Sequence, residues 1–171
     1  MTGKFLRGFL DGSLSTLGIV IGASSASGAI IIAAALGGTL ANSIANLLSA
    51  FSAEGADSYR ELRQVEEAMV SHELKGSEAE RLASRRTIRA GAFDGFATLI
   101  GGTIPMLPYL FLSASEAMLL AITLVVVSVS LIGIYMGRLS RRNIFYSAIK
   151  MAVFAIAVAT VVYFVQLLVV P

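Results

Sequence analysis

The chain has 171 residues, of which 56% are hydrophobic and only 14% are charged, whereas soluble domains are about 45–50% apolar and about 25% charged. This composition predicts an all-α polytopic membrane protein with a single transmembrane domain over residues 1–171. The absence of cysteine excludes disulfides, thiolate metal sites and cysteine nucleophiles. The lone His72 excludes a metal centre with several histidine ligands.

Five stretches are long and apolar enough to span a bilayer, which takes about 20 residues. They cover roughly residues 5–23, 29–53, 90–112, 117–137 and 144–170. We retain the first as a span rather than a signal peptide, because its apolar run is long and contains Asp11. The polar segment 54–89 is rich in helix formers, so we expect a charged helical hairpin that turns at Gly76.

The basic residues predict the orientation of these spans. All but one of the 13 Lys and Arg residues fall in residues 1–7, in the 54–89 segment or in the 138–142 loop. By the positive-inside rule, the N-terminus is then cytosolic and the C-terminus lies outside. The remaining cation, Lys150, lies two turns inside the fifth span, from where its side chain can extend back to the cytosolic interface.

Two spans carry an aspartate in similar phrases, Phe9-Leu10-Asp11-Gly12 and Ala92-Phe93-Asp94-Gly95. A carboxylate at the centre of a membrane helix costs about 2.5–3.5 kcal/mol, and such residues often mark a substrate path. The repeated phrase also suggests a parallel internal repeat, in which the third and fourth spans correspond to the first and second.

Small and polar residues form one stripe along each of the first three spans. The stripes are Asp11, Ser15, Gly18 and Gly22; Thr39, Asn42, Asn46, Ser49 and Ala53; and Asp94, Thr98, Gly101, Pro105 and Pro108. If these faces converge, the acids form an anionic vestibule near the cytosolic side, together with Glu54 and Asp57. Because oxygen donors suit divalent cations, we predict a transport pathway lined by Asp11, Glu54, Asp94, Asn42 and Asn46.

Plainer interpretations remain open at this point. The stripes can be packing seams, with Asn42 and Asn46 as interhelical hydrogen-bond partners. Either aspartate can pair with a nearby cation, namely Lys4, Arg7, Arg86 or Arg89. The protein can then be a membrane scaffold or assembly subunit without any path. A membrane-embedded enzyme ranks last, because no nucleophile–base pair is recognisable.

The chain resembles the vacuolar iron transporter family. The matching features are Asp11-Gly12 in the first span, Ser49-Ala50-Phe51-Ser52-Ala53-Glu54-Gly55 at the end of the second, and Ile104-Pro105-Met106-Leu107-Pro108-Tyr109 in the third. The resemblance implies proton-coupled export of Fe²⁺ or Mn²⁺ from the cytosol by a homodimer, with the pathway at the subunit interface. Asp11 then corresponds to the family's first-span acid, and Glu54 to the acid that ends its second span.

The sequence departs from the family pattern in two places. Ala50 stands where the family usually has a methionine, so a thioether ligand is missing there. The cytosolic segment is also short, and its possible metal ligands are Glu66, Glu67, Met69, Glu73, Glu78 and Glu80. We therefore expect a compact, divergent member in a prokaryotic cell membrane. Its substrate is Fe²⁺ or Mn²⁺, held by Asp11 and Glu54 and captured by Glu66, Glu67, Met69 and Glu73, with no tightly bound cofactor and no nucleic-acid partner.

Overall fold

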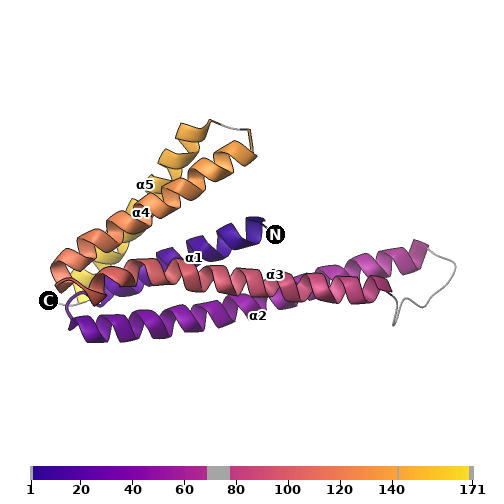
Figure 1. Cartoon of the computed structure of the whole chain (residues 1–171), viewed down its shortest axis with the longest axis horizontal. Helices are drawn as coiled ribbons and strands as arrows, with labels where there is room; N and C mark the ends of the chain where they lie inside the picture. Colours follow the sequence, from indigo (N-terminus) through magenta and orange to yellow (C-terminus); the bar gives the residue numbers. More distant parts are fainter. Residues whose placement is uncertain (1, 69–77, 142, 170–171) are drawn as a thin grey trace.

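The computed structural model describes residues 2–68, 78–141 and 143–169. The chain forms α1 (Thr2–Gly22), α2 (Gly28–Ala68), α3 (Glu78–Thr103), the short 3₁₀ helix η1 (Ile104–Leu110), α4 (Ala114–Leu139) and α5 (Ile144–Val169), as shown in Figure 1. The described residues contain helices and short turns but no strand. The predicted all-α class is confirmed.

Four of the described helices are long and apolar enough to cross a membrane, namely α1, α2, α4 and α5. The sequence predicted a further span over residues 90–112. In the structure this stretch is divided, because α3 ends at Thr103 and η1 follows. Pro105 lacks the N–H that would continue the α-helical ladder, and Pro108 lies inside η1. The rest of α3, residues 78–89, is polar and charged, so no single helix here has both the length and the apolarity.

Helices α1 and α3 run side by side in the same direction, and α2 runs antiparallel to both (Figure 1). At 41 residues, α2 is about 60 Å long, which is twice the thickness of a hydrocarbon core. It therefore extends together with the first half of α3 well past the start of α1. The predicted turn at Gly76 lies outside the described residues.

The molecule has two ends, visible in Figure 1, and they differ in their content of basic residues. The N-terminus, the far parts of α2 and α3 and the α4–α5 turn lie toward one end, which we call the basic end because it holds Lys4, Arg7, Arg138 and Arg141. The α1–α2 turn, the η1–α4 turn and the last turns of α5 lie at the opposite end. The α4–α5 hairpin leans away from α1 toward the basic end.

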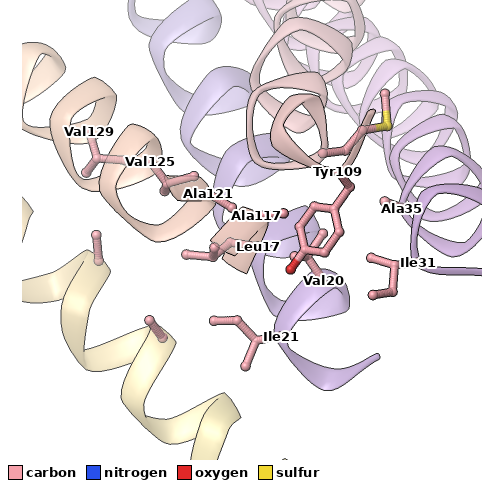
Figure 2. Packing of buried hydrophobic residues seen from close by; sticks show 13 residues of the cluster. Leu17, Val20, Ile21, Ile31, Ala35, Tyr109, Ala117, Ala121, Val125 and Val129 are labelled. Carbon is pink, nitrogen blue, oxygen red and sulfur yellow. The ribbon is translucent and has the colours of Figure 1, made fainter. Parts of the chain in front are cut away.

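The apolar core lies toward the opposite end, where α1, α2, η1, α4 and α5 contribute to the packing. Figure 2 shows Leu17, Val20 and Ile21 of α1 beside Tyr109 of η1 and the inner face of α4. That face is a run of residues at four-residue spacing: Ala117, Ala121, Val125, Val129, Gly133 and Gly137. Many large apolar side chains on the outside of the bundle remain exposed. A bilayer solvates such a surface, so the fold is that of a multi-pass membrane protein.

Candidate functional site

Glycines bring the backbones of α1 and α3 into direct contact beside both aspartates. A Cβ atom added at Gly12 would lie 2.8 Å from the carbonyl carbon of Thr98, and one at Gly101 would lie 2.9 Å from that of Phe9. Gly8 faces the backbone of Asp94 in the same way. Only glycine allows this separation, so the two helices hold Asp11 and Asp94 close to their shared seam.

The Asp11 side chain leaves this seam toward α2 and meets two asparagines. Asn46 donates a hydrogen bond from Nδ2 to Asp11 Oδ2, and Asn42 approaches the same oxygen at 3.3 Å. Asn42 also donates to Ser15 Oγ at 2.9 Å. Asp11 and Ser15 are four residues apart on α1, and Asn42 and Asn46 are four residues apart on α2. One face of α1 therefore meets one face of α2. Three of the five residues predicted for the pathway therefore gather at one place.

Thr98 joins this group from α3. Its Oγ1 accepts a hydrogen bond from Asn46 Nδ2 at 3.0 Å and donates to the backbone oxygen of Asp94 at 2.9 Å. Sequence reasoning placed Ser15 and Thr98 on the polar stripes but did not assign either to the site. The signal that could have found them was their spacing of four from Asp11 and Asp94. We call Asp11, Ser15, Asn42, Asn46 and Thr98 the polar cluster.

Two further buried hydroxyl contacts lie beside the polar cluster, one toward the opposite end and one at the level of the cluster. The hydroxyls of Thr16 and Thr39 are hydrogen-bonded to each other at 2.7 Å, and both residues are buried. Ser43 donates to the backbone oxygen of Gly95 at 2.7 Å. Polar side chains thus line the contact of α1, α2 and α3 over several turns.

The Asp94 carboxylate does not join the polar cluster. It is fully buried, and its Oδ2 forms an ion pair with Arg7 Nη2 of α1. Within the part of the chain that the structure describes, its Oδ1 has no hydrogen-bond partner. The pairing with a nearby arginine, which the sequence left open, is what the structure shows; the assignment of Asp94 to the pathway stays a prediction.

The remaining predicted ligands belong to the far part of α2 or to the segment beyond it. Glu54 lies eight residues past Asn46, which is about 12 Å along the helix axis. Glu66 and Glu67 follow on the same helix, whereas Met69 and Glu73 lie outside the described residues. Where the structure describes side chains, it brings no three His, Cys, Asp or Glu residues together as a metal-binding group.

The polar cluster offers oxygen ligands of mixed character to a cation. Asp11 supplies the negative charge, Ser15 and Thr98 supply hydroxyls, and the two asparagines supply amides. In the structure both amides turn their Nδ2 toward Asp11. A cation bound to the Asp11 carboxylate would contact the amide oxygens after each amide group had rotated to turn its oxygen toward Asp11. Such a donor set suits divalent cations that accept carboxylate, carbonyl and hydroxyl ligands.

The fold and this cluster define a multi-pass helical membrane protein with a carboxylate-centred polar site between its first three helices. Its similarity to known proteins narrows the class. The model of the VIT family matches residues 49–167. A protein of Methanocaldococcus jannaschii, named only as an uncharacterized protein, is 39% identical over 168 residues, which covers 96% of this chain and 88% of the relative. The chain therefore belongs to the VIT family, and this membership suggests transport of metal ions across a membrane.

Proposed function

We propose that this protein exports a divalent transition-metal ion, Fe²⁺ or Mn²⁺, from the cytosol in exchange for protons. Membership of the VIT family supports metal transport in general. The observation that carries the proposal for this chain is the polar cluster. It holds the Asp11 carboxylate within hydrogen-bond distance of two amides of α2, and those amides also donate to the hydroxyls of Ser15 and Thr98.

The proposed topology has five spans, with α3 and η1 together forming the third. Between Glu78 and Leu110 the chain returns from the basic end to the opposite end, as α1 and α5 also do (Figure 1). Without this crossing, α4 could not start from the same end as α2. By the positive-inside rule the basic end faces the cytosol, so the N-terminus is cytosolic and the C-terminus is outside. The far parts of α2 and α3 then form a cytosolic helical hairpin.

Metal and protons would compete for the same carboxylate. A bare carboxylate within a membrane bundle is costly unless a cation or a proton neutralises it. When the metal leaves Asp11, uptake of a proton restores neutrality, and this gives a physical route to exchange. Glu54 and Asp94 complete the proposed pathway, and the acids of the hairpin, Glu66, Glu67 and Glu73 with Met69, would capture metal before it enters. The proposed assembly is a homodimer.

The test is uptake of Fe²⁺ and Mn²⁺ into proteoliposomes with a pH gradient, in which wild type is compared with Asp11→Asn. The matched control is Glu116→Gln, because Glu116 is exposed at the start of α4 and its carboxylate bonds only to Ser113 Oγ in the described structure. We expect Asp11→Asn to abolish gradient-driven flux in folded protein and Glu116→Gln to keep it. Full flux by Asp11→Asn would remove Asp11 from the mechanism.

The Arg7–Asp94 ion pair favours a second candidate function, a membrane scaffold without transport. It shows that one of the two membrane aspartates is already matched by a cation of its own chain. A scaffold predicts that purified protein binds no divalent metal and carries no flux. The same two aspartates would then affect only stability. Measured flux of either metal that depends on Asp11 would exclude this candidate.

A further inference from the structure

The outer face of α3 changes from basic to apolar along the helix. Arg85, Arg89, Phe93, Phe96 and Ile100 follow one another at intervals of three or four residues, so they lie on one face. All five are exposed, and the three apolar side chains are 44%, 61% and 39% exposed in that order. The opposite face of α3 packs on α1 and α2, whereas the α4–α5 hairpin packs on α1 and η1. The outer face of α3 therefore meets the surroundings of the protein.

The two arginines of this face are not matched by acids of the neighbouring helix. Buried Thr87 faces α2, because a Cβ atom added at Gly55 would lie 4.0 Å from Thr87 Cγ2. Arg85 and Arg89 are each two residues from Thr87, which is about 200° around the helix, so both lie on the side away from α2. Asp57 is likewise two residues from Gly55 and lies on the side of α2 away from α3. Among the described residues, neither arginine forms a salt bridge.

The end of the basic stretch marks the level of the membrane surface on α3. Beyond Arg89 every exposed residue of this helix is apolar. The head-group layer adds about 5–7 Å to each side of the hydrocarbon core. Along the helix axis, Arg85 lies about 6 Å above Arg89, whereas Arg81 lies about 12 Å above it. Arg85, Arg86 and Arg89 are thus within reach of phospholipid phosphates, and Arg81 lies beyond them.

We propose that the outer face of α3 binds an anionic phospholipid, with its phosphate at Arg85, Arg86 and Arg89 and its acyl chains along Phe93 and Phe96. A guanidinium can bind a phosphate through two parallel hydrogen bonds. Arginines beside a membrane favour anionic over zwitterionic lipid by about fivefold each. A soluble acidic partner would not contact the phenylalanines, so lipid is the occupant that matches both halves of the face. This site requires that α3 and η1 cross the membrane, but it needs no metal transport.

The experiment is native mass spectrometry of the full chain released from nanodiscs that contain equal amounts of phosphatidylglycerol and phosphatidylcholine. We expect wild type to retain phosphatidylglycerol preferentially. Arg89→Gln should reduce the ratio of retained phosphatidylglycerol to phosphatidylcholine about fivefold. The matched control is Arg81→Gln, which removes an exposed arginine of the same helix about two turns farther from the membrane. It should leave the ratio within about twofold of wild type, because its distance exceeds the Debye length of about 8 Å at physiological salt.

Both substitutions are at exposed positions, and glutamine has nearly the helix propensity of arginine, so the variants should fold. The proposal is overturned if wild type shows no preference for phosphatidylglycerol, or if Arg89→Gln and Arg81→Gln reduce the ratio equally. It is also overturned if Arg89→Gln shifts the protein from dimer to monomer and leaves the lipid ratio unchanged. That result would show that a second copy covers the outer face of α3 instead.

Discussion

Replacement of Gly12 by alanine should separate α1 from α3. The added Cβ would lie 2.8 Å from the carbonyl carbon of Thr98 and 2.9 Å from the backbone nitrogen of Gly102, where ordinary contacts begin at 3.4 Å. These neighbours are backbone atoms and cannot rotate away, so the helices must move apart by about 0.6 Å or more. Overpacking of this kind costs about 1–3 kcal/mol, which lowers the melting temperature of a chain of this size by about 2–12 °C.

Gly18→Ala is the matched control on the same helix. Its Cβ would meet only Val162 Cγ2 at 3.8 Å, which is an ordinary contact. Both substitutions gain the same helix propensity, about 1 kcal/mol, so the difference between their melting temperatures isolates the packing cost. The assay is thermal unfolding of each purified variant in one detergent. Equal melting temperatures would refute the close backbone contact of α1 with α3.

Two further changes test the polar contacts in the same unfolding assay. Arg7→Gln should destabilise the protein by about 3–5 kcal/mol, because it leaves the buried Asp94 carboxylate without its counter-ion. Asp94→Asn should destabilise the protein less than Arg7→Gln does, because Arg7 is exposed and water can solvate its charge. A larger loss of stability in Asp94→Asn than in Arg7→Gln would contradict this reasoning. Thr16→Val should lower the free energy of unfolding by about 1–3 kcal/mol, because it leaves the buried Thr39 hydroxyl unpaired. The double variant with Thr39→Val should recover most of this loss of stability. A double-mutant cycle without coupling would disprove that contact.

The helices and part of the polar cluster could be predicted because both depend on local periodicity. Apolar runs gave both bounds of α1, α4 and α5 closely and the start of α2, which continues beyond its apolar run to Ala68. Spacing of four placed Asp11 with Ser15 and Asn42 with Asn46 on single faces. The observed contacts between these two faces confirm that the stripes meet. The third span was harder, because its apolar residues are shared by an α-helix and a 3₁₀ helix around Pro105.

The surroundings of Asp94 depend on non-local geometry. Its position on a stripe with Thr98 was correct, and Thr98 does contact Asn46. Which helix the carboxylate faces is fixed by the rotation of α3 about its own axis, and this follows from the glycine contacts with α1. A periodic pattern gives the residues of one face but not the neighbour that the face meets. The sequence could therefore name Arg7 only as one of several partners.

The repeated Asp-Gly phrase illustrates how one local motif acquires two roles. In each copy a glycine stands three residues before the aspartate and another directly after it, Gly8 and Gly12 in α1 and Gly91 and Gly95 in α3. The first pair packs on the backbone of α3, and the second pair packs on that of α2.

Successive residues turn by about 100° on a helix, so each aspartate is placed at the edge of a close helix contact rather than inside it. The Asp-Gly motif thus directs its carboxylate toward the helix that lies next to the close glycine contact. For Asp11 that helix is α2, which offers the side-chain amides of Asn42 and Asn46. For Asp94 it is α1, which offers the guanidinium of Arg7. The neighbouring helix, and not the motif, therefore determines whether the carboxylate meets neutral amides or a cation.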